Sequence, residues 1–314
     1  MSEKLSVSFS PHLQDRRSIC SMNFMTILAL APAFLFGFYY YGLRAVVIVA
    51  LSMVTAMVVE SIIEMIMKKP LTYKTGSAAL TGLLLAMLLP VGVPWWLVMI
   101  GAAVAVLLGR QLFGGLGGNP FNAVLVGWVV LRLSWPTLMS TFHEATPLLG
   151  GWGDLSEIDG SELPLSLLKM GDSGGALDIY ELKNVLWGNI PGGIGSTSVI
   201  GLAIGGLFLV IRRIVPWQVP AGFLGGFLVF ALIFWLTDEA GELYANPLYH
   251  LIFGYTLIGA FFLATDPTTS PYSSLGGLIF GIVAGVVTLV IRYWGAYPDG
   301  VTFAILFMNT LTPT

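Results

Sequence analysis

The sequence predicts an all-α integral membrane protein with about ten transmembrane helices. Two observations lead to this class. Of the 314 residues, 56% are hydrophobic and only 10% are charged, and long apolar stretches recur from residue 21 to the C-terminus. Soluble domains carry about 25% charged residues, and a helix needs about 20 apolar residues to cross the hydrocarbon layer. The composition therefore excludes a soluble domain and makes the lipid bilayer a partner of the chain.

Ten apolar segments follow one another, separated by charged residues, glycine or proline. The third segment, which ends at Pro90, and the last segment are short, and the fifth must start afresh at the Pro-Phe step after Asn119. We expect membrane crossings at 21–39, 44–67, 77–90, 94–112, 120–135, 198–214, 218–236, 246–265, 273–291 and 300–312.

The distribution of positive charge favours a cytoplasmic N-terminus. In that orientation nine of the 14 Lys and Arg residues lie on the cytoplasmic side. Residues 1–20 then form a cytoplasmic segment, 21–135 a first membrane unit, 136–197 an acidic outer loop, and 198–314 a second membrane unit. The net charge of -3 gives no indication of a nucleic-acid partner.

The two membrane units resemble each other weakly. A glycine lies eight residues before Pro90 and again before Pro267, and each unit continues into a helix that ends in Arg110 or Arg292. Because the first unit begins inside and the second outside, we predict two inverted five-helix repeats with interrupted helices. Such repeats place ligand sites near their pseudo-twofold axis. The alternative is a chance recurrence of Gly and Pro, which are common in membrane helices.

A Thr-Pro step in FHEATPLLGG, residues 142–151, is the first candidate site. Thr146 followed by Pro147 is typical of a helix start, with Thr146 as N-cap and Pro147 at the first helical position. A hydroxyl at such a helix end also lies beside backbone N–H groups that can hold a phosphate. The residues alone leave both interpretations open.

Three further segments combine glycine, asparagine or aspartate with an interrupted helix. Gly195 and Thr197 belong to GNIPGGIGSTSVIG, a turn that can cradle a phosphate or a polar cofactor edge, or lead flexibly into the sixth span. Asn119 and Asn122 flank the Pro-Phe step, where amides satisfy freed backbone groups or bind a ligand. Asp266, in ATDPTTSPYSS, either caps a loop or contacts a quinone, flavin or ion.

Two carboxylates, Glu60 and Glu64, share one face of the second span. We expect them to extend toward Lys68 at the cytoplasmic end of the helix. The alternative is that they contribute to a cation path.

The remaining chemistry of the sequence is sparse. Neither a metal-ligand cluster nor a hydrolase pattern stands out. The single cysteine, Cys20, cannot form an internal disulfide or ligate an iron–sulfur cluster by itself. If this chain handles electrons, it requires an organic cofactor.

At these same residues the chain resembles the D subunit of the Rnf electron-transport complex and the related B subunit of the sodium-pumping NADH:quinone reductase. The matching segments run in one order from SPHLQDRRS at residues 10–18 to PDGVTFAILFMNTLTP at 298–313. The most specific are LTGLLLAMLLP, RQLFGGLGGNPFNAVLVGW, ATPL, FFLATDPTTSP and YPDGVTFAIL. The length of the chain favours the first of these two families.

The resemblance implies FMN esterified through its phosphate to a threonine hydroxyl in an A-T-P-L-like motif on the outer side, and the matching residue is Thr146. The chain departs from the family pattern just upstream. Relatives usually have Ser or Thr three residues before the acceptor and an acidic residue further upstream, whereas this chain has His143 and Ser140 there.

The resemblance also implies, in some members, a second and non-covalent flavin such as riboflavin, or a quinone, inside the bundle. The residues that match segments shared by the two families are Asn119, Asn122, Gly195, Thr197 and Asp266. They are therefore pocket candidates.

As a whole, the resemblance implies a subunit of an ion-translocating oxidoreductase complex that is not catalytic alone, in a bacterial or archaeal cytoplasmic (inner) membrane. Its partners would be other membrane and flavoprotein subunits, including a second subunit with covalent FMN and iron–sulfur subunits. Electrons would reach FMN on Thr146 from a neighbouring flavoprotein subunit, and ferredoxin and NAD chemistry would drive Na⁺ or H⁺ movement. The alternative is a non-redox channel or secondary transporter, which interrupted helices favour equally.

Overall fold

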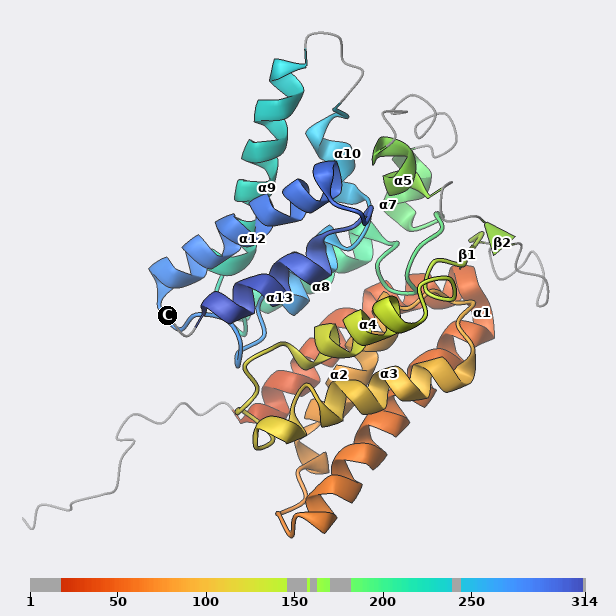
Figure 1. Ribbon diagram of the computed structural model, residues 1–314, viewed down its shortest axis with the longest axis vertical. Helices are drawn as coiled ribbons and strands as arrows, with labels where there is room; N and C mark the ends of the chain where they lie inside the picture. The colour runs from red at the N-terminus through yellow and green to blue at the C-terminus, as the bar shows by residue number, and fades with distance from the viewer. Residues whose placement is uncertain (1–17, 146–156, 159–162, 170–181, 239–243, 313–314) are drawn as a thin grey trace, which may run out of the picture.

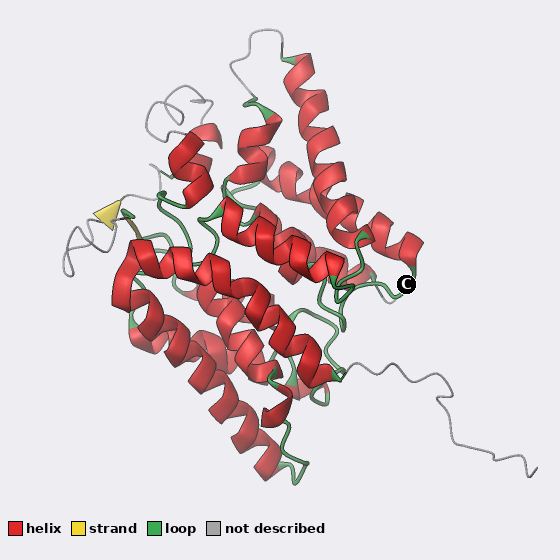
Figure 2. Ribbon diagram, turned by 180° about the vertical axis from the view of Figure 1, so that it is seen from behind, coloured by secondary structure: helices red, strands yellow, loops and turns green. Residues whose placement is uncertain are grey.

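The computed structural model describes residues 18–145, 157–158, 163–169, 182–238 and 244–312, and the structural statements below refer to these residues. Most of the described residues are helical (Figures 1 and 2). Among the described residues, four helical stretches are long and apolar enough to cross a membrane: Ile19–Ile66, Trp95–Phe113, Gln218–Thr237 and Ser274–Trp294. This confirms the predicted class of an all-α membrane protein.

The first helix, α1 (Ile19–Ile66), contains two helical segments joined at a glycine. Gly42 has a φ of 63° and a ψ of -148°. This conformation lies outside the helical region, and its positive φ favours glycine. The chain changes direction there (Figure 1). The break lies between the two spans expected at 21–39 and 44–67.

Helix α1 forms one side of the bundle and contacts α2 (Ser77–Leu88), α3 (Trp95–Leu107) and α8 (Val199–Ile211). Small residues permit these contacts. A Cβ atom on Gly82 of α2 would lie 2.7 Å from the Cα of Met53 in α1, and the Ser52 hydroxyl donates a hydrogen bond of 2.7 Å to the Gly82 carbonyl.

On the opposite side, α9 (Gln218–Thr237) packs along α12 (Ser274–Trp294), and α4 (Ala123–Ser134) and α13 (Val301–Leu311) lie between the two groups (Figure 1). The short 3₁₀ turns η1 (Tyr73–Thr75) and η2 (Gln111–Phe113) precede α2 and follow α3.

One expected span is not a single helix. The segment expected at 246–265 consists of α10 (Pro247–Ile252), a break that includes Gly254, the short helix α11 (Thr256–Ile258) and a π-helical turn, η5 (Gly259–Leu263). Gly254 has a φ of 75°. The expected crossing is thus interrupted, because this glycine takes a left-handed conformation that a continuous helix does not include.

A smaller layer covers one end of the bundle. It contains the two-residue strands β1 (Phe142–His143) and β2 (Glu157–Ile158), which pair antiparallel, and the helices α5 (Pro164–Lys169) and α7 (Leu182–Trp187). A separate hydrophobic cluster holds this layer to α10 and the residues around it: Leu165, Leu168, Val185, Ile190, Ala245 and Phe253. Thr146 follows β1 and lies outside the described residues.

Candidate functional site

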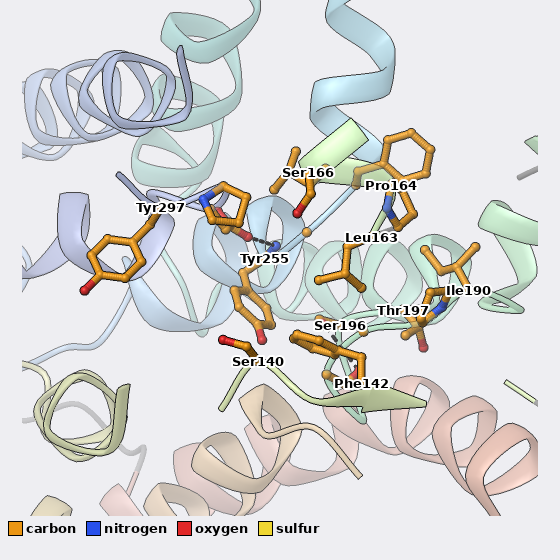
Figure 3. Close-up of a pocket in the computed structure, with 18 of the residues that line it drawn as sticks. Ser140, Phe142, Leu163, Pro164, Ser166, Ile190, Ser196, Thr197, Tyr255 and Tyr297 are labelled. Carbon is orange, nitrogen blue, oxygen red and sulfur yellow. Dashed lines mark hydrogen bonds between the residues drawn. The ribbon is translucent and has the colours of Figure 1, made fainter. Parts of the chain in front are cut away.

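A cavity of about 350 Å³ lies beneath this layer, and we call it the Trp128 cavity. Its volume is in the range of small-molecule sites. Segments far apart in sequence form its walls: α4, the stretch after α4, α5, the glycine-rich turn and the break after α10. Figure 3 shows Phe142, Leu163 and Tyr255 extending into the same space. Its aromatic residues are Trp128, Phe142, Phe253, Tyr255 and Tyr297.

Two buried polar atoms of this cavity are unpaired. Trp128 is 5% exposed and Thr197 is 2% exposed, and both line the space. Within the described part of the chain, neither the Trp128 Nε1 nor the Thr197 Oγ1 has a hydrogen-bond partner. A buried polar group without a partner is costly and calls for a bound molecule or water. Both residues border the cavity, so a molecule bound there could supply the missing partners.

The glycine-rich turn forms one wall of the Trp128 cavity and is hydrogen-bonded to the end of α2. The Ile194 N–H donates to the Leu89 carbonyl and the Gly195 N–H to the Met87 carbonyl, both at 3.0 Å. These two N–H groups thus satisfy carbonyls at the C-terminal end of α2. Gly195 allows this approach, since a Cβ atom there would collide with the Met87 side chain.

A buried ion pair fixes the wall around Tyr255. The Asp299 carboxylate accepts from the Tyr255 N–H at 2.6 Å and from the Arg292 guanidinium at 3.1 Å. Arg292 also donates to the Thr256 hydroxyl at 2.7 Å and to the backbone carbonyl of His250. The guanidinium therefore connects α12, the end of α10 and the start of α11, and it fixes the backbone on either side of Tyr255.

The roof of the cavity is formed by Leu163 and by the first three residues of α5, Pro164, Leu165 and Ser166. The Lys169 ammonium, at the end of α5, donates to the Gly295 and Tyr297 carbonyls just beyond α12. A cation at the C-terminal end of a helix is favourable because unpaired carbonyls collect there. This contact fastens the roof to the second half of the bundle.

A second cavity of about 290 Å³ lies around the N-terminal end of α4, and we call it the Arg110 cavity. Its polar lining is Asn23, Thr26, Ser77, Thr81, Arg110, Asn119, Asn122, Thr265, Asp266 and Thr268, and its aromatic lining is Phe261 and Phe262. It thus combines a polar side with aromatic rings, as cofactor sites commonly do.

A second buried ion pair stands beside this cavity. The Arg110 guanidinium contacts the Glu60 carboxylate at 3.0 Å, and it donates to the hydroxyls of Ser77 at 3.0 Å and Thr81 at 2.7 Å. Glu64 accepts instead from the backbone N–H and the hydroxyl of Thr72. The expectation that both glutamates extend toward Lys68 is wrong, because Arg110 pairs with Glu60 and Thr72 donates to Glu64.

The three predicted residues Asn119, Asn122 and Asp266 lie together in the Arg110 cavity. The Asn119 amide donates to the Thr268 hydroxyl at 2.9 Å, and that hydroxyl donates to the Asp266 carboxylate at 2.9 Å. Asn122 caps α4 by accepting from the Val124 N–H at 3.0 Å, while its amide donates to the Leu263 carbonyl at 3.0 Å. These side chains thus cap the loop and satisfy backbone groups, which was one interpretation of the sequence. They also border the cavity, so the ligand-binding interpretation stays open.

The remaining predicted residues are distributed differently. Thr197 lines the Trp128 cavity, Gly195 packs on Met87, and Thr146 lies outside the described residues. Sequence reasoning missed Trp128 and Tyr255, because the topology that unites them with Thr197 leaves no local signal in the chain.

Comparison with known proteins gives the family. The model of the NQR2, RnfD, RnfE family matches residues 6–314. The chain is 36% identical over 309 residues to the D subunit of the Na(+)-translocating ferredoxin:NAD(+) oxidoreductase complex of Acetobacterium woodii, covering 98% of this chain and 92% of the relative. It is 36% identical over 316 residues to the D subunit of the proton-translocating complex of Clostridium ljungdahlii, with the same coverage. It is 34% identical to the D subunit of the ion-translocating oxidoreductase complex of Erwinia tasmaniensis, with 98% and 94% covered. The chain therefore belongs to the NQR2, RnfD, RnfE family.

Proposed function

We propose that this chain is the flavin-carrying membrane subunit of an ion-translocating ferredoxin:NAD oxidoreductase complex, with FMN held by a phosphoester to Thr146. Its relatives carry the names of D subunits of such complexes over nearly their whole length. The observation that carries the flavin part is the Trp128 cavity, which lies beside the segment that leads to Thr146.

The cavity fits the ring system of a flavin. It offers aromatic faces, about 350 Å³ of space and unpaired polar atoms, as a planar heterocycle with a polar edge requires. Phe142 lines it, and Thr146 is four residues further along the chain. Four residues span at most about 14 Å. A flavin tethered at Thr146 is thereby kept near the cavity.

The residues of this chain would bind and orient the group. The ring faces would pack on Phe142 and Tyr255, and the roof helix α5 would limit the access of water. When bound, the flavin supplies the capacity to accept and donate electrons, and the protein contributes orientation and control of the potential.

We further propose that the Arg110 cavity holds a second, non-covalent flavin such as riboflavin. Asn119, Asn122 and Asp266 would contact its polar edge, and Phe261 its ring. Helix α4 borders both cavities, and Asn122 and Trp128 are six residues apart, which is about 9 Å along a helix axis. This spacing supports electron passage between the two sites through the bundle.

The proposed setting is a bacterial or archaeal inner membrane, with ten crossings in two inverted five-helix repeats, the N-terminus cytoplasmic and Thr146 on the outer side. The two ion pairs support the repeat. Arg110 and Arg292, which the sequence matches, each contact one carboxylate and one threonine hydroxyl on a short helix, Thr81 or Thr256. The proposed partners are the other membrane and flavoprotein subunits of the complex, among them a second subunit with covalent FMN and iron–sulfur subunits.

The test is flavin fluorescence of the denatured chain in a gel, after co-production with its flavin transferase. We expect a fluorescent wild-type band, a dark band for Thr146→Ala, and a fluorescent band for Thr141→Ala. Thr141 is a matched control because it lies five residues upstream, where its hydroxyl donates to the Thr137 carbonyl. A dark wild-type band, with the transferase active on another substrate, would overturn the flavin proposal and favour a non-redox channel or transporter.

A further inference from the structure

The two unpaired polar atoms of the Trp128 cavity differ from unpaired groups that lie away from both cavities. Thr302, for example, also has a buried hydroxyl without a partner among the described residues, but it borders neither cavity. Trp128 Nε1 and Thr197 Oγ1 instead belong to side chains that face a space large enough for a ligand. Their lack of partners thus coincides with a place where a ligand can supply them.

We infer that Trp128 and Thr197 position the flavin ring by hydrogen bonds to its polar atoms, so that Trp128 sets the affinity of the ring for electrons. The inference rests on the proposed function. An indole N–H can only donate, so its partner must be a carbonyl oxygen or an unprotonated ring nitrogen. A threonine hydroxyl both donates and accepts, so it can pair with either kind of atom on the ring edge.

Contacts within the wall hold both side chains in place. The Trp128 ring meets Tyr255 edge-on at 6.1 Å between centroids and Phe303 at 5.8 Å. Tyr255 is fixed in turn, because its hydroxyl donates to the Leu88 carbonyl at 2.9 Å. A rotation of the indole would break these ring contacts, so they restrict the direction of the N–H. Such preorganisation favours electrostatic control of a bound group.

Thr197 is held by its neighbours in the glycine-rich turn. The turn is fastened to the end of α2, as described above, and Ser198 begins α8 with its hydroxyl accepting from the Gly201 N–H at 3.1 Å. Thr197 therefore lies between two fixed points of the backbone. The wall is continuous up to Tyr255, because a Cβ atom on Gly193 would lie 3.0 Å from the Tyr255 ring.

The expected consequence is a shift of the reduction potential. A donor hydrogen bond strengthens as its acceptor gains negative charge, so the Trp128 N–H stabilises the reduced ring more than the oxidised ring. Trp128→Phe keeps an aromatic ring against Tyr255 and Phe303 but removes the donor. We expect the reduced-to-oxidised ratio of this flavin to fall about tenfold at a fixed potential, which equals about 30 mV for a two-electron couple. Thr197→Val, which preserves the shape of the side chain, should also shift the potential.

The experiment is a redox titration of the purified complex, followed by visible absorption. A complex with Thr146→Ala provides the baseline, so that the difference isolates the tethered flavin. The matched controls are Trp96→Phe and Thr302→Val, since neither residue borders the cavity. Denatured-gel flavin fluorescence is recorded for every variant to show that the tether has formed.

Three outcomes decide between the alternatives. A fluorescent band with a more negative potential in Trp128→Phe, a shift in Thr197→Val and wild-type potentials in both controls would support the inference. A fluorescent band with unchanged potentials in Trp128→Phe and Thr197→Val would overturn it and leave the proposed function in place. A dark wild-type band would overturn the proposed function, and the inference with it.

Discussion

Replacing Arg110 with leucine removes the cationic partner of a fully buried carboxylate. The Glu60 side chain is 0% exposed and that of Arg110 is 10% exposed, and their charged atoms are 3.0 Å apart. Breaking a buried ion pair costs about 3–5 kcal/mol, mainly because the remaining charge stays buried without compensation. We expect Arg110→Leu to lower the free energy of unfolding by an amount in this range.

The double variant Arg110→Leu/Glu60→Leu tests the cause of that loss. With both charges removed, the desolvation cost disappears, and replacing a buried pair by apolar residues is often neutral. The hydroxyls that lose Arg110 keep other partners, since Thr81 donates to the Ser77 carbonyl at 3.0 Å. We therefore expect the double variant to be within about 1–2 kcal/mol of wild type, the cost of the lost neutral hydrogen bonds.

The assay is unfolding of the purified chain in mixed micelles by increasing sodium dodecyl sulfate, followed by tryptophan fluorescence. The reasoning is refuted if Arg110→Leu alone costs less than about 1 kcal/mol, well below the range for a broken buried pair. It is also refuted if the double variant is no more stable than the single one, because the loss would then come from packing rather than from an unpaired charge.

Two further predictions concern the second ion pair and the break in α1. Asp299→Asn should cost about 3–5 kcal/mol in the same assay, because the Arg292 side chain is 1% exposed and loses its only charged partner in the described structure; a neutral result would mean that the carbonyls around Arg292 suffice. Gly42→Ala should cost about 1–3 kcal/mol through its backbone conformation alone, since no described atom lies within 4 Å of a Cβ placed there. Gly225→Ala, at an equally open helical site, should be neutral or stabilising by up to about 1 kcal/mol, and equal effects at both glycines would contradict the backbone argument.

The positions of the helices were largely predictable because the signals that start and end them are local. Pro90 follows the end of α2, Ser198 begins α8 as its N-cap, and Asn122 begins α4 in the same way. Each of these residues acts on backbone groups within a few positions of itself. Apolar runs between such residues are therefore a reliable guide to helices in this chain.

The break within residues 246–265 was not predictable in the same way. The segment is apolar throughout, and hydropathy is the same for a straight helix as for one interrupted at Gly254. What fixes the interruption is Arg292, which lies 42 positions after His250 and takes its backbone carbonyl as acceptor. A contact at that separation leaves no trace in a local pattern.

The partner of Glu60 was also not predictable from the local sequence. On an isolated helix the nearest cation toward the cytoplasmic end is Lys68, and spacing alone favours it. In the bundle, α3 brings Arg110 against the same face from 50 positions away. Burial then decides between the two cations, because a pair removed from water interacts more strongly than one at the surface.

The late start of α4 connects the fold with the two cavities. Asn122 satisfies the first turn of α4 inside the bundle, where its own backbone N–H donates to the side-chain carbonyl of Asn309 at 3.1 Å. A helix that continued one or two turns further toward its N-terminus would place backbone and side chains in the Arg110 cavity. The interruption therefore creates that cavity, and the same short helix carries Trp128 to the other one. Two separate cavities along one helix thus depend on an asparagine cap in the middle of an apolar segment, which is where this sequence has one.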